Sequence, residues 1–118
     1  MTVQKIYLVG FSYTGKTTIG RLLAKKLGWL FYDLDEMIVK FHKKSIPEIF
    51  NNEGEKKFRI LETNTLKKLS KDTNIVVATG GGAITQKNNR EIMKNGLIVC
   101  LEAKPKTITD KIKMKYLD

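Results

Sequence analysis

The residues with the clearest chemistry lie near the N-terminus, in the run Gly10-Phe11-Ser12-Tyr13-Thr14-Gly15-Lys16-Thr17. This run fits the pattern G-x-x-x-x-G-K-[ST] in full and lies between a predicted strand and a predicted helix. A loop of this kind turns backbone N–H groups toward one point at the positive end of a helix, where phosphate binds. Lys16 adds a cation for the β- and γ-phosphates, and the Thr17 hydroxyl is placed to hold Mg²⁺. The run therefore predicts a nucleoside triphosphate site.

Two carboxylates, Asp33 and Asp35, come at the end of the second predicted strand. One of them can hold Mg²⁺, directly or through water. The other can accept a hydrogen bond from an acceptor hydroxyl and orient or deprotonate it. The alternative interpretation is a solvated helix N-terminus, because Asp and Glu favour the first turn of a helix.

An arginine and a glycine run complete the candidate residues. Arg59 stands out because the chain has 19 lysines and only 3 arginines, and the planar guanidinium suits a carboxylate better than lysine does. Glu62, three residues on, can hold Arg59 in place, although an ordinary surface pair is the alternative. The run Gly80-Gly81-Gly82 directly follows a predicted buried strand, which implies the close approach of another group, and a ligand is the expected one.

The elements that must position these residues alternate between strands and helices. Short β-rich runs cover Lys5–Val9, Trp29–Asp33, Ile75–Ala78 and Leu97–Leu101. Helical patterns separate them, so the order predicts an α/β fold with a parallel sheet and helices on both faces. Ligands of such sheets bind beyond the carboxyl ends of the strands, which is where the phosphate loop, the two aspartates and the glycine run lie.

Helix signals are strong at several places. A first helix ends at Gly28, and Ser45 and Glu48 form a predicted capping box. A longer helix is expected over about residues 55–71, a short one over about 88–95, and a last one after Pro105. The apolar face of the first helix is expected to consist of Ile19, Leu22, Leu23 and Leu27. That of the long helix consists of Phe58, Leu61, Thr65 and Leu69, and that of the last helix of Ile108, Ile112 and Tyr116.

Composition limits the function classes. A chain of 118 residues has room for one domain, and it contains no apolar run of the roughly 18 residues that a membrane helix needs. Its single cysteine, Cys100, fits a reducing cytoplasm, and no Cys/His cluster suggests zinc. The net charge of +10 comes from scattered lysines, which disfavours a nucleic-acid partner. The only histidine, His42, and Cys100 are interpreted as structural residues.

Taken together, the motifs resemble those of the shikimate kinase family. The resemblance rests on the phosphate loop, on Asp33-x-Asp35, on Phe58-Arg59-x-x-Glu62 and on Thr79-Gly80-Gly81-Gly82, in this order and spacing. It covers roughly residues 5–112 and implies a P-loop kinase fold, whose parallel sheet has the order 2-3-1-4-5 in the family. Four of those strands are visible in this sequence.

The resemblance implies ATP-dependent phosphorylation of the shikimate 3-hydroxyl, on the route to chorismate and the aromatic amino acids. It assigns Thr17 and Asp33 to Mg²⁺, Lys16 and Asp35 to catalysis, and Arg59 to the shikimate carboxylate, with Asp35 meeting the acceptor hydroxyl. The ATP phosphates would contact Tyr13, Thr14, Gly15, Lys16, Thr17 and Thr18, and shikimate would contact Asp35, Arg59, Gly80, Gly81 and Gly82.

The sequence also predicts a departure from the family. Residues 1–118 form one kinase core with 33–62 as its acceptor-binding segment, while the lid and the fifth strand of the family are expected to be absent. Little or no kinase activity is expected of this chain, and a bare edge is expected on the fourth strand. The alternatives are a non-catalytic relative that binds nucleotide or shikimate, and another small-molecule kinase, for gluconate or a nucleoside monophosphate. A cytoplasmic monomer without nucleic-acid or membrane partners is expected.

Overall fold

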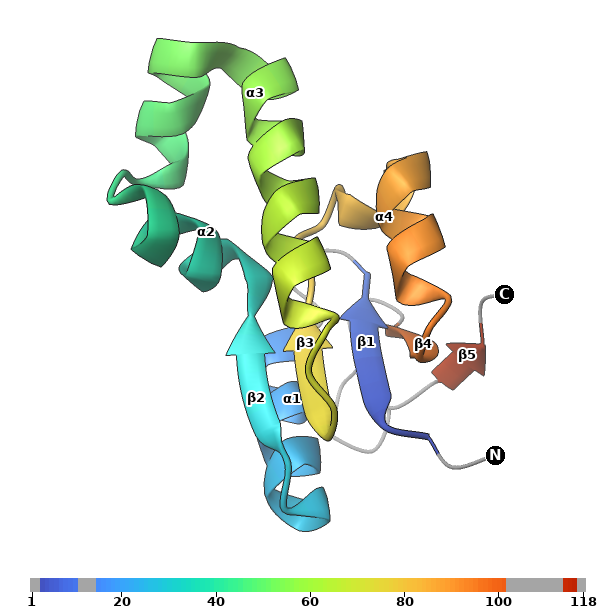
Figure 1. Cartoon of the computed structure of the whole chain (residues 1–118). Helices are drawn as coiled ribbons and strands as arrows, with labels where there is room; N and C mark the ends of the chain where they lie inside the picture. The colour runs from blue at the N-terminus through green and yellow to red at the C-terminus, as the bar shows by residue number, and fades with distance from the viewer. Residues whose placement is uncertain (1–2, 11–14, 102–113, 117–118) are drawn as a thin grey trace.

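Four parallel strands form the centre of the molecule (Figure 1). The computed structural model describes residues 3–10, 15–101 and 114–116. The strands are β1 (Lys5–Val9), β2 (Leu30–Asp33), β3 (Ile75–Ala78) and β4 (Leu97–Leu101), in the spatial order β2-β3-β1-β4. β1 pairs in parallel with both β3 and β4, and β2 pairs in parallel with β3. The α/β class and the order 2-3-1-4 are therefore confirmed.

A fifth strand, β5 (Met114–Tyr116), pairs antiparallel with β4 along Val99–Leu101. The expectations of a helix reaching Tyr116 and of a bare β4 edge are wrong at this place. The segment alternates lysine with apolar residues, which fits a strand as well as a helix, and pairing satisfies backbone groups at the edge of the sheet. The rest of the expected last helix, from Pro105 to Ile112, falls mostly in 102–113, outside the described residues.

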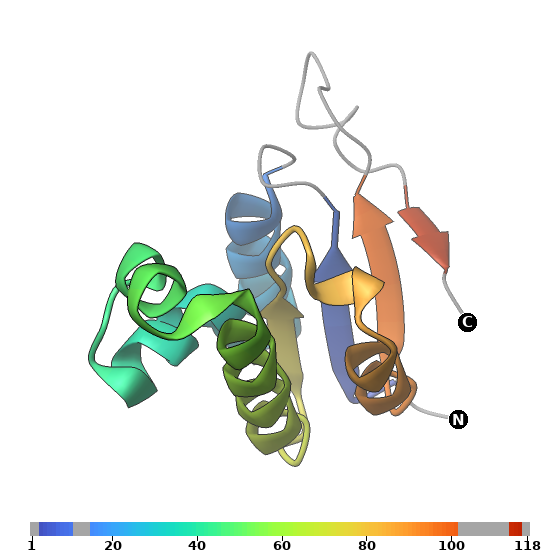
Figure 2. The ribbon, with the colours of Figure 1, turned by 90° about the horizontal axis from the view of Figure 1, so that it is seen from above.

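Helices cover both faces of the sheet (Figure 2). One face carries α1 (Lys16–Leu27), and the other carries α3 (Ile46–Leu69) and α4 (Lys87–Met93). Because successive strand residues point to opposite faces, β1 divides its side chains between two cores. Ile6 and Leu8 pack in the core with α1, whereas Tyr7 and Val9 pack in the larger core on the opposite face.

The buried face of α1 differs from the expected one. Leu22 and Leu27 are 50% and 43% exposed, whereas Ile19, Gly20 and Ala24 are buried. The helix packs through its small residues, and Gly20 lies so close to the ring of Phe31 that a Cβ has no room. The predicted end at Gly28 is confirmed by its left-handed backbone, with φ 70°.

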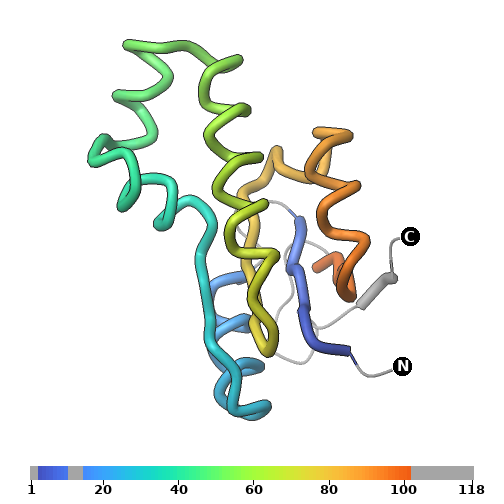
Figure 3. The backbone as a smooth tube through the Cα atoms, in the orientation of Figure 1, coloured from blue at the N-terminus to red at the C-terminus, as the bar shows by residue number. Residues whose placement is uncertain are grey.

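The chain leaves the sheet after β2 and returns to it through two helices and a sharp bend (Figure 3). After β2 come α2 (Leu34–His42) and then α3, whose start is fixed by the predicted capping box. Ser45 Oγ accepts from the Glu48 N–H at 3.2 Å, and Glu48 Oε1 accepts from the Ser45 N–H at 3.3 Å. α3 begins nine residues before the expected position and is kinked at Gly54, where φ is 85°. Its predicted buried face, Phe58, Leu61, Thr65 and Leu69, is confirmed.

The described residues contain no helix that is both long and apolar enough to cross a membrane.

Candidate active site

The carboxyl ends of the parallel strands open onto a cavity of about 200 Å³. Residues from the start of α1, from the β2–α2 junction and from the end of β3 line this cavity. They are Gly15, Lys16, Thr17, Thr18, Asp33, Asp35, Ala78, Thr79, Gly80 and Gly81. Three sequence motifs, spread over residues 15–81, thus meet at one site, as the parallel-sheet rule predicts.

The phosphate-loop side of the cavity is held by the start of α1. Gly15 has the left-handed backbone, φ 84°, that lets the chain turn into the helix. Lys16 is only 6% exposed, and its ammonium donates to the carbonyl of Gly10. Burial lowers the pKa of Lys16, while Asp35 and Asp33 oppose this shift and help to keep the ammonium charged. Tyr13 and Thr14 lie outside the described residues.

Asp33 makes one contact as a helix cap and another with the threonine of the phosphate loop. Its Oδ1 accepts from the Glu36 N–H at 3.1 Å as the N-cap of α2, and its Oδ2 accepts from Thr17 Oγ1 at 3.1 Å. A hydroxyl and a carboxylate thus meet beside the phosphate loop. This pair fits Mg²⁺, which takes one or two protein oxygens and completes its shell with water and phosphate. The described residues hold no group of three His, Cys, Asp or Glu that could bind a metal by themselves.

Asp35, in the first turn of α2, is the carboxylate that faces the cavity with an open acceptor. Its Oδ1 is buried and has no hydrogen-bond partner among the described residues. Burial raises the pKa of Asp35, and so does the nearby Asp33, whereas the positive charges of Lys16 and Arg59 lower it. A buried oxygen of this kind costs free energy unless a donor meets it, so the site suits a hydroxyl group of a ligand.

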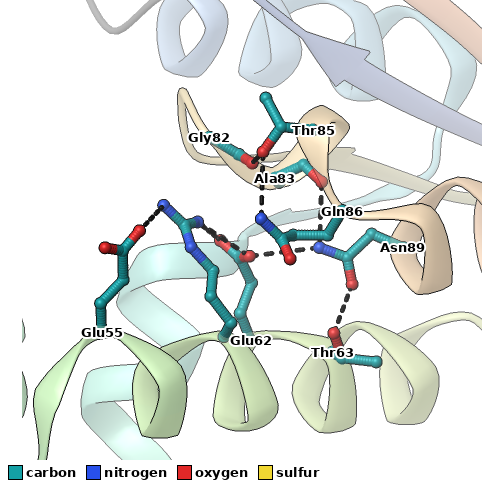
Figure 4. A network of polar contacts seen from close by, with 9 residues as sticks. Glu55, Glu62, Thr63, Gly82, Ala83, Thr85, Gln86 and Asn89 are labelled. Carbon is teal, nitrogen blue, oxygen red and sulfur yellow. Dashed lines mark hydrogen bonds and ion pairs between the residues drawn. The ribbon is translucent and has the colours of Figure 1, made fainter.

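Arg59 is held by Glu62 on α3. Figure 4 labels Glu62 and Glu55, the two carboxylate partners of Arg59. Arg59 Nη1 donates to Glu62 Oε1 at 3.1 Å and to Oε2 at 3.3 Å, and Glu62 is only 1% exposed. Glu55 lies 3.8 Å from Nη2, and the guanidinium lies over the Phe58 ring, 5.3 Å from its centroid. The Nε of Arg59 is buried and has no partner among the described residues. Because Glu62 is buried, this contact is not an ordinary surface pair.

The glycine run makes room for these two side chains. A Cβ on Gly80 would lie 2.9 Å from Asp35 Oδ1, and a Cβ on Gly82 would lie 2.6 Å from Arg59 Nη2. The close approach that the sequence assigned to a ligand is therefore made, at these two positions, by Asp35 and Arg59 themselves. Arg59 lines a second cavity, of about 440 Å³, between α3 and the start of α4.

Two buried polar residues at the site were missed by the sequence analysis. Thr79 Oγ1 donates to the carbonyl of Leu8 at 2.9 Å and so ties the end of β3 to β1. Asn89, fully buried on α4, donates to Glu62 Oε1 at 3.1 Å. Thr79 entered the sequence analysis only as the first residue of the glycine motif, without a role of its own. Asn89 belongs to no motif or period, so no local signal could identify it. His42 and Cys100, interpreted as structural, do not line the cavity.

A phosphate loop after the first strand of a 2-3-1-4 parallel sheet, with two carboxylates beside it, defines the P-loop kinase class. The model of the shikimate kinase family matches residues 13–116, and the chain belongs to this family.

Relatives and solved structures agree with this assignment. The chain is 44% identical over 107 residues to a shikimate kinase of Gloeobacter violaceus, covering 91% of this chain and 60% of that protein. It is similar to the structure of shikimate kinase from Acinetobacter baumannii in complex with shikimate, with a TM-score of 0.84 and 48% identity. That match covers 87% of this chain and 58% of that one. For shikimate kinase from Aquifex aeolicus the TM-score is 0.81, at 40% identity, covering 92% and 66%. The chain thus spans about 60% of the length of such relatives.

Proposed function

We propose that this protein binds ATP with Mg²⁺ and shikimate at the cavity beyond β1, β2 and β3. The reaction that this site serves is phosphorylation of the 3-hydroxyl of shikimate, with little or no turnover expected of residues 1–118. The observation that carries the proposal is the position of Asp35. Asp35 lines the same cavity as the phosphate-loop residues Lys16 and Thr17, and its carboxylate feels the positive charge of Arg59. Its buried Oδ1 has no partner among the described residues and can accept a hydrogen bond from a ligand.

The nucleotide side of this proposal uses the start of α1. The backbone of Gly15 to Thr18 and the Lys16 ammonium would hold the phosphates, together with Tyr13 and Thr14 of the same motif. Thr17 Oγ1 and Asp33 Oδ2, which are in contact, would hold Mg²⁺. When bound, Mg²⁺ would neutralise charge on the β- and γ-phosphate oxygens.

The acceptor side uses residues of the segment 33–62 and the glycine run. Asp35 would accept a hydrogen bond from the shikimate 3-hydroxyl and so orient its oxygen. It would then take up the proton of this hydroxyl as phosphoryl transfer proceeds. Arg59, its planar fork held by Glu62, would bind the shikimate carboxylate through charge-assisted hydrogen bonds. Gly80, Gly81 and Gly82 would let the backbone approach the substrate closely.

A relative supports shikimate as the acceptor. The similar enzyme of Acinetobacter baumannii was solved in complex with shikimate. The activity, the cytoplasmic location and the monomeric state of the whole protein are part of the proposal. The single cysteine of the chain fits a reducing cytoplasm, and sedimentation analysis tests the monomer.

Titration calorimetry on this 118-residue chain tests the acceptor. Shikimate is titrated with and without Mg²⁺–ADP, and gluconate and a nucleoside monophosphate serve as competitors. We expect shikimate to bind, Arg59→Ala to weaken this binding strongly, and the competitors not to displace it. The matched control is Arg21→Ala, because Arg21 is exposed, lies 3.9 Å from Glu36 and over the Phe31 ring, and does not line the cavity. Intact nucleotide binding without shikimate binding, or displacement by a competitor, would refute the proposed acceptor.

A further inference from the structure

A buried asparagine connects the arginine of the acceptor side to the glycine run. Asn89, the third residue of α4, is fully buried. Its side-chain amide contacts three residues: Nδ2 donates to Glu62 Oε1 at 3.1 Å and to the carbonyl of Ala83 at 3.0 Å, and Oδ1 accepts from Thr63 Oγ1 at 2.7 Å. Figure 4 shows this network between α3, the turn after the glycine run and α4.

The amide fits this position in one orientation only. Both of its N–H groups meet acceptors, a carboxylate and a carbonyl, while its oxygen meets the Thr63 hydroxyl. The reverse orientation would set the amide oxygen against two acceptors, which is unfavourable in a buried place. Asn89 is therefore fixed, and it fixes the distance between Glu62 and Ala83.

Each of these two partners controls one side of the acceptor site. Glu62 holds the guanidinium of Arg59 through both carboxylate oxygens. Burial raises the pKa of Glu62, whereas the hydrogen bonds from Arg59 and Asn89 lower it, so Asn89 helps to keep this carboxylate charged. Ala83 directly follows Gly82, the residue against which the guanidinium packs. Asn89 thus connects Glu62 to Ala83, and the guanidinium of Arg59 lies between Glu62 and Gly82.

We propose that Asn89 is a positioning residue for substrate recognition, which aligns Arg59 with the glycine run so that the shikimate carboxylate meets the guanidinium. The inference rests on the proposed function, because it names how the same site is held in shape. Asn89 does not line the cavity of the phosphate loop, so its effect is confined to the acceptor side.

Binding measurements separate this role from a general structural one. In Asn89→Ala we expect shikimate affinity to fall about tenfold, the effect of losing a hydrogen bond to a charged group, while Mg²⁺–ADP affinity stays within about twofold. The matched control is Asn95→Ala. Asn95 follows α4, contacts Tyr7 and Ser70, and takes no part in the site. Equal losses for both ligands, equal losses in both variants, or unchanged shikimate affinity would overturn the proposal.

A ligand-free measurement keeps the test independent of the proposed function. The chain has only three arginines, so their Nε–H signals are readily assigned by NMR. We expect hindered rotation of the Arg59 guanidinium in the wild type, and faster rotation in Asn89→Ala but not in Asn95→Ala. If the wild type does not bind shikimate, the proposed function fails and this signal alone decides the role of Asn89. An unchanged Arg59 signal would overturn it.

A milder variant covers the case in which Asn89→Ala does not fold. Thr63→Val removes only the hydroxyl that fixes the amide orientation. We expect it to weaken shikimate binding about threefold and to speed Arg59 rotation, without an effect on Mg²⁺–ADP. A wild-type Arg59 signal in this variant would contradict the proposal.

Discussion

Substitution of Gly82 by alanine should displace Arg59 without disturbing the backbone. Gly82 has φ −96° and ψ −1°, a conformation that alanine adopts without strain. Its added Cβ would lie 2.6 Å from Arg59 Nη2 and 3.0 Å from Nη1. Ordinary van der Waals contact requires about 3.5 Å, so the guanidinium must move by about 0.9 Å. The end of a flexible side chain can make this movement, and we expect the free energy of unfolding to change by less than about 1 kcal/mol.

The effect on binding should be much larger than the effect on stability. A movement of this size misaligns the guanidinium relative to a bound carboxylate and stretches its hydrogen bonds to Glu62, which measure 3.1 and 3.3 Å. A hydrogen bond to a charged group contributes about 1.5–3 kcal/mol. We therefore expect shikimate affinity to fall about ten- to hundredfold, and Mg²⁺–ADP affinity to stay unchanged.

A double-mutant cycle by calorimetry, with chemical denaturation as the stability measurement, checks this mechanism. Gly82→Ala, Arg59→Ala and the double variant are compared with the wild type. If the methyl group acts through Arg59, it has no further effect once Arg59 is alanine. Wild-type affinity in Gly82→Ala would refute the steric reasoning. An equal loss with and without Arg59 would show that the methyl group acts on the glycine run instead.

Three further predictions concern other parts of the site and its support. Thr17→Val removes the hydroxyl that contacts Asp33. Chelation of Mg²⁺ should weaken ADP binding about tenfold in the wild type but much less in this variant. Equal Mg²⁺ dependence of ADP binding in both proteins would contradict the assignment of Thr17 to Mg²⁺. Asp35→Asn should stabilise the fold near pH 7 by about 0.5–2 kcal/mol, because the raised pKa of Asp35 means that the ionised form is disfavoured in the folded state. This gain should shrink as the pH falls toward 3.8, the ordinary pKa of the group. A difference in the free energy of unfolding between variant and wild type that does not change with pH would count against the prediction. Ser45→Ala should cost about 1 kcal/mol by removing one half of the capping box with Glu48, as denaturation measures, while Asn51→Ala on the same helix serves as an exposed control.

Much of the fold was predictable because its signals are local. The bounds of β1, β3 and β4 match the predicted runs residue for residue, since each is a short β-rich segment that ends in a turn or loop. Ser45 and Glu48 mark a helix start through their own side chains, so the capping box needs no tertiary information.

The errors arise where packing overrides local pattern. The face of α1 was predicted from its leucines, but the helix packs through Gly20 and Ala24 and leaves Leu22 exposed, because Phe31 on β2 fills the space beside Gly20. The continuation of α3 back to Ile46 depends on the positive φ of Gly54, which the sequence permits but does not require. The pairing of β5 with β4 is a long-range contact with no local signal.

The candidate site divides in the same way. The sequence identified Lys16 through the phosphate-loop pattern, Asp35 through its place at the end of a strand, and Arg59 because arginine is rare in this chain. It did not predict that Asp35 and Arg59 themselves occupy the space beside Gly80 and Gly82, which only the folded geometry reveals. Asn89 escaped notice because its importance comes from its folded contacts, two of which are with residues 26 and 27 positions away.

The most direct test of the account is to map both ligands on this chain by amide NMR. Mg²⁺–ADP is expected to shift the signals of residues 15–18 and Asp33, and shikimate those of Arg59 and residues 80–82. The two sets should meet at Asp35, which both ligands shift. Shikimate shifts elsewhere, for example at Lys67 to Leu69 at the end of α3, would contradict the claim that one cavity brings the phosphate donor and the acceptor together. Two sets of shifts that do not meet at Asp35 would contradict it as well.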